Sequence, residues 1–582
     1  MTTPPNWDLG LLYVPGSPEL ERDLAALRSK KEAFQAYREL LRERQPSLAE
    51  FGAMTRELEA LRVLESNLEG WADLRFSQDT AHEEALAFLA QVREESAELE
   101  AAVLFYEIWW KELEPAAAER YLASLPEFDY YLRQARALLE HTLSEPEERI
   151  VALKNPNGRE ALVTLYSSYT NRYTFDSSFV PGGDGQPLNR EELAVHFRSH
   201  LPEVRAKAYQ ELLRVYGQDG PFLAQIYQAL VRDWRQENVR LRGYGSPALV
   251  RHKANDLPES VVASLLRVCQ SRGPAVFGRY FQKKAQALGQ ARLRRYDLYA
   301  PLFEDKGRWE FGEAMDLVRD SFSSFAPQLA QLAGNVAESR HLDAALRPNK
   351  ASGAFCASLA PGQIPWVLMS FKGRTQDLFT LAHELGHAAH SQLAREQNIF
   401  QFHASLPLAE TASTFGEMLL AKRLLQDAGP QEKEALLFHL MDDAYATVGR
   451  QAFFALFETQ AHELINQGAP ARALAEAYLE NLKTQFGQAV EVAPEFSWEW
   501  VAIPHFYFAP FYVYAYSFGQ LLVYSLWRVY EKEGPDLAQR LMTLLARGGS
   551  GSPLDLVAEA GLGPLDDDFW AGGFEVIEGF LG

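Results

Sequence analysis

The sequence predicts a mainly α-helical protein with a small β component. Amphipathic patterns with helical spacing cover most of its 582 residues, and helix start signals recur along the chain. Short apolar runs bounded by proline and glycine, which are typical of strands, are confined to two regions. A chain of this length is too long for one hydrophobic core, so we expect two or more lobes.

The N-terminal region contains clear helix signals. Ser17, Pro18 and Glu19 form an N-cap, a first-turn proline and a first-turn acid, and an amphipathic run follows them to Leu41. Residues 46–145 continue the charged and apolar pattern with few glycines, which indicates several packed helices.

A change of pattern before residue 190 indicates a lobe boundary. TFDSSFV at 174–180 predicts a strand, and the glycine-rich PGGDGQP that follows predicts a turn. Asn189 and Glu192 then form a capping box that begins the next helix. We therefore expect an N-terminal helical lobe at 1–189 and a second lobe at 190–582.

The second lobe is predicted to be helical apart from one hairpin. Within 351–373, GAFCAS and PWVLMSF are joined by a Pro-Gly turn at 361–362, which predicts two short paired strands. The remaining segments are expected to be helical, with a glycine- and serine-rich connection at 548–553. These helical segments are 190–290, 375–395, 408–428 and 431–580.

The composition indicates a soluble protein of a reducing compartment. A formal net charge of -21 argues against nucleic acid or an anionic membrane as the main partner. The two cysteines, Cys269 and Cys356, are too few for a disulfide framework. The N-terminus lacks the pattern of a signal peptide, and no segment has the roughly 18 uninterrupted apolar residues of a membrane span. We expect a cytoplasmic location.

The segment HELGHAAH at 383–390 predicts a metal site. His383 and His387 are four residues apart, so on a helix both imidazoles can face one ion. Glu384 is directed away from the shared face but can reach a water bound to that ion and take its proton. This is the chemical basis of the His-Glu-x-x-His spacing. The related stretch HELIN at 462–466 lacks the second histidine, and we expect it to be an ordinary helix surface.

A third ligand must lie outside this segment. His390 is about 10 Å further along the helix axis than His383, which favours a supporting role. His403 and Glu410 are both possible donors, and Glu410 begins a second helix that could fold back on the first. Glu417, seven residues later on the same face, could orient a ligand histidine. Gly386 would permit the close approach of another element.

Several further stretches of the sequence are distinctive. They are NWDLGLLY near the start, RLRGYGSPALVRHKANDLP at 240–258, YDLYAPL at 296–302, FKGRTQDLFTLAHELGHAAHS at 371–391, ETASTFGE at 410–417 and PHFYFAPFYVYAYSFG at 504–519. Together these motifs resemble the oligoendopeptidase F branch of the thimet-oligopeptidase-like zinc metallopeptidases. The resemblance extends over nearly the whole chain.

The resemblance implies a ligand set and a fold. It implies that His383, His387 and Glu410 bind one zinc ion and that Glu384 is the catalytic base. It also implies an elongated, multi-helical body with a deep substrate channel and a small sheet beside the zinc helix. The lobe at 190–582 would then be the catalytic lobe.

The resemblance further implies that His505 and a nearby tyrosine hold the substrate and the developing oxyanion. If their segment is helical, Tyr512 and Tyr516 share a face and are the candidates, while Tyr514 points elsewhere. The sequence leaves open which of the three is the donor.

The predicted function is zinc-dependent hydrolysis of internal bonds in short, unstructured peptides. Glu384 would activate the zinc-bound water, and the strand at 366–371 would align the substrate through main-chain hydrogen bonds. A zinc carboxypeptidase on a similar scaffold is the alternative within enzymes. A non-catalytic peptide-binding protein is a further alternative, which the intact Glu384 disfavours.

Overall fold

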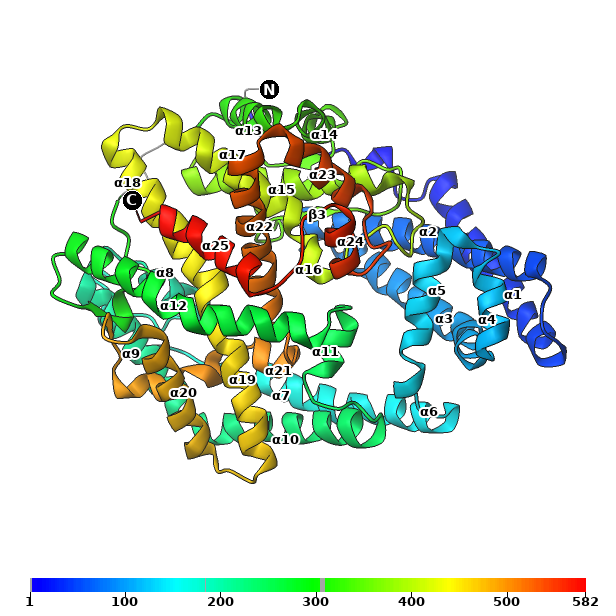
Figure 1. Cartoon of the computed structure of the whole chain (residues 1–582), viewed down its shortest axis with the longest axis horizontal. Helices are drawn as coiled ribbons and strands as arrows, with labels where there is room; N and C mark the ends of the chain where they lie inside the picture. Colours follow the sequence, from blue (N-terminus) through cyan, green and yellow to red (C-terminus); the bar gives the residue numbers. More distant parts are fainter. Residues whose placement is uncertain (1–2, 184, 304–308, 582) are drawn as a thin grey trace. The chain divides into compact units, whose positions relative to one another are not determined.

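The computed structural model describes residues 3–183, 185–303 and 309–581, which form mainly α-helices (Figure 1). The chain divides into two compact units, each assembled from three stretches of sequence. Unit 1 comprises Met1–Leu139, Asp305–Gln426 and Glu533–Leu562; unit 2 comprises Glu140–Glu304, Asp427–Lys532 and Gly563–Gly582. The predicted mainly α class is confirmed, while the lobes at 1–189 and 190–582 stay a prediction. Within the described residues, no helix combines the length and apolarity needed to cross a membrane.

The elements of unit 1 are η1 (Leu9–Leu11), α1 (Pro18–Glu43), α2 (Leu48–Gln78), α3 (Glu83–Glu112), α4 (Pro115–Leu122), η2 (Pro126–Phe128), α5 (Asp129–Ala137), α13 (Phe311–Phe325), α14 (Pro327–Glu338), β2 (Leu342–Asp343), β3 (Phe355–Ala357), β4 (Trp366–Leu368), α15 (Thr375–Leu393), η7 (Ala394–Glu396), α16 (Leu406–Ala409), α17 (Thr411–Asp427), α23 (Pro535–Ala546) and α24 (Pro553–Glu559).

The elements of unit 2 are α6 (Glu145–Lys154), η4 (Asn155–Asn157), α7 (Arg159–Thr170), α8 (Arg190–His196), α9 (Pro202–Gln218), α10 (Gly220–Trp234), η5 (Arg235–Leu241), α11 (Leu249–Ala254), α12 (Glu259–Ala287), β1 (Leu293–Arg294), η6 (Arg295–Asp297), α18 (Pro430–Ala444), η8 (Tyr445–Gly449), α19 (Arg450–Asn466), α20 (Ala471–Phe486), β5 (Val490–Glu491), η9 (Pro494–Ala502), α21 (His505–Phe508), α22 (Tyr514–Glu533) and α25 (Asp567–Gly579). The short η3 (Leu139–His141) spans the boundary.

The core of unit 1 joins its N-terminal helices to its sheet. Helices α1, α2 and α3 pack side by side, as Figure 1 shows in blue, and Ser17 caps α1 as predicted. Their buried side chains form one cluster that also includes Trp366 and Leu368 of β4. The rings of Trp7 and Trp366 meet edge to face, with centroids 6.2 Å apart. The apolar core therefore fixes the position of the sheet.

The sheet of unit 1 has the order β2-β4-β3, with β2 parallel and β3 antiparallel to β4. The predicted hairpin is confirmed, and β2 is an addition to it. Because β4 pairs on both sides, the prediction that the strand at 366–371 offers its edge to a substrate is wrong. The edge strands of this sheet are β2 and β3, and β3 is the one that packs against α15.

Helices α15 and α17 approach closely in unit 1. A Cβ atom on Gly386 would lie 2.6 Å from the Cα of Ser413 and 2.7 Å from the carbonyl oxygen of Ala412. Gly386 thus permits the close approach that the sequence predicts at this position.

The predicted strand at 174–180 does not form in unit 2. Phe175 makes an isolated bridge with Leu188, but the carboxylate of Asp176 accepts hydrogen bonds from the amide and hydroxyl of Ser178. Such a local bond turns the chain in competition with strand pairing. The capping box of Asn189 is present as predicted.

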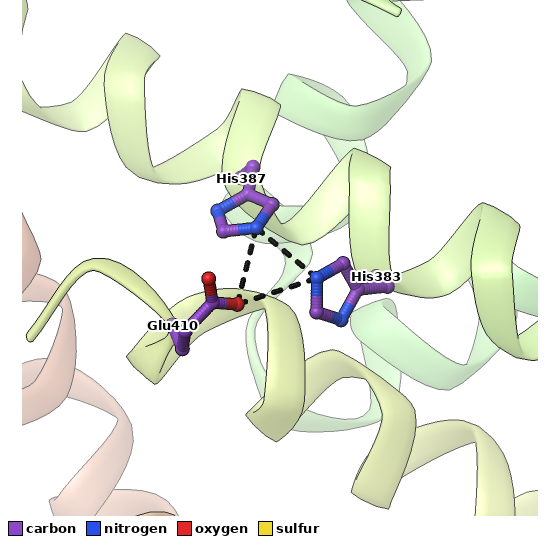
Figure 2. Close-up of side chains that lie close together, drawn as sticks. All are labelled: His383, His387 and Glu410. Atoms are coloured by element: carbon purple, nitrogen blue, oxygen red, sulfur yellow. Dashed lines mark hydrogen bonds and ion pairs between the residues drawn. The ribbon is translucent and has the colours of Figure 1, made fainter. Parts of the chain in front are cut away.

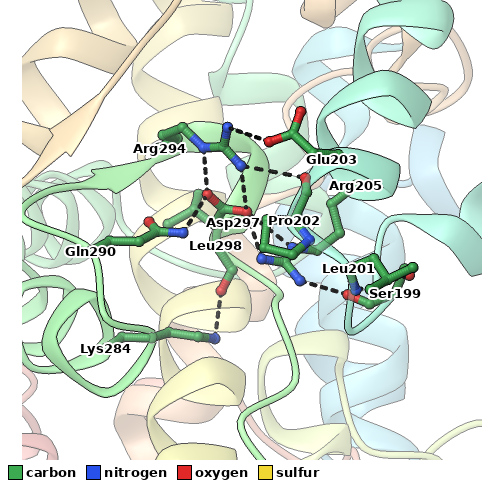
Figure 3. A network of polar contacts seen from close by, with 10 residues as sticks. All are labelled: Ser199, Leu201, Pro202, Glu203, Arg205, Lys284, Gln290, Arg294, Asp297 and Leu298. Carbon is green, nitrogen blue, oxygen red and sulfur yellow. Dashed lines mark hydrogen bonds and ion pairs between the residues drawn. The ribbon is translucent and has the colours of Figure 1, made fainter.

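Asp297, within the YDLYAPL segment, is the centre of a buried polar network in unit 2 (Figure 3). It accepts two bonds from Arg205, at 2.8 and 3.0 Å, two from Arg294, at 2.7 and 3.3 Å, and one from Gln290 at 3.0 Å. Burial favours the neutral acid, but the hydrogen bonds from Arg294 and Arg205 hold the pKa of Asp297 below its usual range. The network ties α9 to the segment after α12.

The expectation that HELIN at 462–466 is ordinary helix surface is wrong for its histidine. His462 is 3% exposed on α19, and its ring packs against that of Phe511. Burial lowers the pKa of His462 to about 3, so the imidazole is neutral. Glu463, the next residue, is exposed as expected.

The contact at Gly386 generates a stability prediction. We expect Gly386→Ala to lower the free energy of unfolding by about 1–3 kcal/mol, because the new methyl group meets backbone atoms that must move. The control is Gly278→Ala within α12, where the nearest atom would be the Cβ of Ala489 at 3.8 Å. Alanine is the better helix former, so the control should hold or raise the Tm. Equal thermal unfolding curves for the two variants would contradict the packing argument.

Candidate metal centre

Helix α15 places the two histidines of HELGHAAH on one face. Its start is fixed by Asp377, whose carboxylate accepts bonds from the amides of Lys372 at 2.6 Å and Arg374 at 3.0 Å. His383 and His387 are therefore one turn apart, and both are half-buried.

Glu410 lies opposite the two histidines, between α16 and α17 (Figure 2). The Nε2 atoms of His383 and His387 are 3.1 Å apart, and each lies 3.3 Å from Oε2 of Glu410. A tetrahedral ion with bonds of about 2.0–2.1 Å separates its ligand atoms by roughly 3.3 Å. The three donor atoms thus fit three of the four positions around one tetrahedral ion such as zinc, which leaves one position for a further ligand.

Two further side chains orient these donors. Nδ1 of His383 donates to Oε1 of Glu417 at 2.5 Å, which presents the other ring nitrogen, Nε2, to the site. The hydroxyl of Ser413 lies 3.0 Å from both the main-chain oxygen and Oε2 of Glu410. The sequence predicts Glu417 in this supporting place but gives no signal for Ser413, because its role depends on the approach of α17.

The centre is rich in negative charge. Burial lowers the pKa of His383, but the hydrogen bonds that its imidazole donates to the carboxylates of Glu410 and Glu417 outweigh burial and raise that pKa to about 11. Burial favours neutral Glu410, yet the two histidines hold its pKa well below the usual range. With neutral imidazoles, the carboxylates of Glu384, Glu410 and Glu417 attract a cation.

Glu384 is 6% exposed and follows His383 directly, but it is not one of the three grouped donors. Burial raises the pKa of its carboxyl, and His383 and His387 partly offset that rise. Its place beside the donor group, without belonging to it, suits a proton acceptor better than a ligand.

The other two histidines of this region stand apart from the donor group. His390 is buried and hydrogen bonds the backbone of Ala409, the residue before Glu410. His403 is exposed. Of the two possible third donors, the structure therefore brings Glu410 to His383 and His387.

Strand β3 presents main-chain groups at its open edge beside α15. The amide of Val367 donates to the carbonyl of His341, towards β2, and Val367 is the partner of Cys356 in the register. Main-chain groups alternate in direction along a strand, so the amide and carbonyl of Cys356 point away from β4. Burial and then the carboxylate of Glu384 raise the pKa of the Cys356 thiol.

His505, Tyr512 and Tyr516 form a second group, within unit 2. Nε2 of His505 lies 3.3 Å from the hydroxyl of Tyr516, and the rings of Tyr512 and Tyr516 are 5.3 Å apart. All three side chains are half-buried. Burial, and then the charge of Arg450, lower the pKa of His505, which favours the neutral imidazole.

The hydroxyl of Tyr514 is hydrogen bonded to other side chains of unit 2. Tyr514 is 2% exposed, and its hydroxyl lies 2.8 Å from Nδ2 of Asn255 and 3.1 Å from Nδ1 of His252. This arrangement leaves Tyr512 and Tyr516 as the candidate donors of unit 2.

Comparison with known families identifies the chain. It matches peptidase family M3 over residues 195–575, with the histidine motif inside that range, and the oligopeptidase F family over residues 109–175. The chain belongs to peptidase family M3. The predictions of an endopeptidase enzyme and of the oligoendopeptidase F branch are confirmed.

Named relatives of this M3 peptidase are oligopeptidases. Oligopeptidase PepF of Bacillus subtilis is 29% identical over 72% of the chain, and the match spans 63% of that relative's length. The plasmid oligoendopeptidase F of Lactococcus lactis subsp. cremoris is 26% identical over 99% of the chain and 96% of its own length.

Solved structures share the fold of this M3 peptidase. Oligoendopeptidase-F from Enterococcus faecium has a TM-score of 0.72 at 22% identity, with 97% of each chain covered. PZ peptidase A with inhibitor 2 has a TM-score of 0.74 at 17% identity, again with 97% of each chain covered.

The hydrogen bond between His383 and Glu417 generates a prediction for metal affinity. We expect Glu417→Gln to weaken zinc binding by about 10–100-fold, because the charged acceptor that orients His383 is lost. Competition with a chromophoric chelator measures the affinity. The control is Glu396→Gln, an exposed acid of η7 paired with Arg395. Wild-type affinity in the Glu417 variant would show that this bond does not support the ligand.

Proposed function

We propose that this M3 peptidase is a zinc-dependent oligoendopeptidase that hydrolyses internal bonds of short, unstructured peptides. The observation that carries the proposal is the group of His383, His387 and Glu410, whose donor atoms have the separations that one tetrahedral ion requires, directly beside the buried Glu384. Membership of a peptidase family supports peptides as substrates.

The roles of the residues in unit 1 follow from this arrangement. His383, His387 and Glu410 would hold the zinc ion. When bound, such an ion supplies Lewis acidity, lowering the pKa of a water to about 7 and polarising a carbonyl group. Glu384 would take a proton from the attacking water and pass it to the leaving nitrogen. Glu417 and Ser413 would keep the ligands in place.

We propose that the open edge of β3 aligns the peptide. The outward main-chain groups of Cys356 can pair with an extended peptide irrespective of its side chains. Main-chain recognition of this kind would allow the site to accept peptides of varied sequence. The role of aligning the substrate would therefore belong to β3 in place of the segment at 366–371.

In unit 2, we propose that His505 and the hydroxyls of Tyr512 and Tyr516 hold the substrate and its developing oxyanion. A neutral tyrosine hydroxyl donates a hydrogen bond without the desolvation penalty of a buried cation. The half-exposed state of Tyr512 and Tyr516 supports this assignment over Tyr514, whose hydroxyl is occupied. A deep substrate channel and a cytoplasmic location belong to the same proposal.

The catalytic assignment is tested with a quenched peptide amidated at its C-terminus. We expect chelation to abolish its cleavage and Glu384→Gln to lower kcat by at least about 100-fold, because glutamine cannot accept the proton. Zinc content and Tm should stay at the wild-type values, since Glu384 is not one of the grouped donors. The matched control is Glu463→Gln, which changes the same His-Glu-Leu sequence on the exposed surface of α19.

Two outcomes would contradict the proposal. Near-wild-type turnover by Glu384→Gln would remove Glu384 as the base. Cleavage restricted to peptides with a free C-terminus would indicate the carboxypeptidase alternative, and mass spectrometry of the products identifies the bond that is cut.

A further inference from the structure

The turn between α21 and α22 carries an unusual backbone conformation. Phe511 has a φ of 55°, in the left-handed region that is rare for an aromatic residue. The other non-glycine residues with positive φ in the described chain are Asp256, Arg340 and Asn349, which are polar or charged. A conformation of this kind persists where its surroundings enforce it, and it is most frequent at functional sites. Tyr512 follows Phe511 directly.

Glu458 of α19 holds the turn from one side. Its Oε1 accepts a hydrogen bond from the amide of Phe511 at 2.9 Å, and the carboxyl group is 1% exposed. Its Oε2 makes no hydrogen bond within the described residues. A buried carboxyl group is unfavourable for stability, and burial raises the pKa of Glu458 to about 8. The hydrogen bond from the amide of Phe511 is thus the interaction that favours a buried carboxyl group at position 458.

Arg251 of α11 holds the turn from another side. Its Nε donates to the carbonyl of Pro510 at 3.3 Å, and its guanidinium lies 5.8 Å from the ring centroid of Tyr512, within the range of a cation–π contact. His252 and Asn255 of the same segment contact the hydroxyl of Tyr514. The conspicuous sequence RLRGYGSPALVRHKANDLP at 240–258 therefore supplies contacts to residues 510–514.

We propose that Glu458 and Arg251 are positioning residues, which fix the turn at Pro510, Phe511 and Tyr512 and thereby direct the Tyr512 side chain for catalysis. The φ of Phe511 sets the direction in which the chain leaves it, so a return to negative φ would displace Tyr512. In this proposal, neither Glu458 nor Arg251 touches the substrate. This inference rests on the proposed role of Tyr512.

The test compares two substitutions of Glu458 on the quenched peptide. Glu458→Leu removes the acceptor for the amide of Phe511, whereas Glu458→Gln keeps a carbonyl oxygen there. We expect Glu458→Leu to lower kcat by about 10–100-fold with KM changed less than about threefold, because small misplacements of a catalytic group have effects of that size. Glu458→Gln should retain kcat within about threefold of the wild type. Arg251→Met should lower kcat in the same direction as Glu458→Leu.

A matched control separates positioning from general loss of stability. Asn481→Leu removes a partly buried polar group of α20 that donates to the carbonyl of Phe453 on α19, five residues before Glu458. We expect it to lower Tm but not kcat. Hydrogen exchange of a peptide that contains Phe511, followed by mass spectrometry, should accelerate in Glu458→Leu but not in Glu458→Gln or Asn481→Leu.

The outcomes distinguish this proposal from the proposed function. In a first case, the wild type cleaves the peptide and Tyr512→Phe is impaired. Unchanged kcat in both Glu458→Leu and Arg251→Met would then overturn the positioning inference and leave the proposed function intact. If Glu458→Leu does not fold, wild-type kcat in Arg251→Met overturns the positioning inference. Wild-type kcat in Tyr512→Phe would overturn the role of Tyr512 and this inference with it. If wild type shows no metal-dependent cleavage, the proposed function fails, and the exchange experiment still decides whether Glu458 holds the turn.

Discussion

The candidate metal centre depends on the close contact of α15 with α17 at Gly386. His383 and His387 are two candidate ligands on one helix, and a third must come from another element. A side chain at Gly386 would meet the backbone at Ser413 and Ala412, so the absence of one allows α17 to approach. That approach brings Glu410, Ser413 and Glu417 to the histidines together. The geometry of the candidate ligands therefore depends directly on the packing of α17 against α15 in unit 1.

Electrostatics makes the same centre suited to a cation. His383 lies between the carboxylates of Glu410 and Glu417, which raise the pKa of its imidazole against the effect of burial. A divalent ion would compensate the acidic groups. The apolar core of α1, α2 and α3 fixes the neighbouring sheet. The hydroxyls of Ser358, directly after β3, and Ser391 of α15 lie 2.6 Å apart and help to hold the edge of β3 beside α15. The centre thus combines a packed apolar frame with donor side chains that remain partly exposed.

Periodicity predicts the parts of this site that lie on one helix. The spacing of His383 and His387 follows from the helical repeat, and the seven-residue step from Glu410 places Glu417 correctly. Capping patterns likewise predict the starts of α1 and α8. These features are local, so a short window of sequence contains the information that determines them.

Features that depend on contacts distant in sequence are not predicted. The two residues of β2 are too few for a strand pattern, and their parallel pairing makes β4 a central strand. The turn formed by Asp176 prevents a strand that the apolar pattern alone favours. His462 is buried because Phe511 and Tyr227 pack around it, which no spacing within α19 reveals. Chain topology decides these cases.

The most direct test of the central claim is anomalous diffraction at the zinc absorption edge from a crystal of the zinc-loaded protein. The account predicts one strong peak in each molecule at bonding distance, about 2.0–2.2 Å, from Nε2 of His383, Nε2 of His387 and an oxygen of Glu410. Glu384 should lie outside the ligand shell. A peak bound elsewhere, or one in which Glu384 or His390 replaces Glu410, would contradict it.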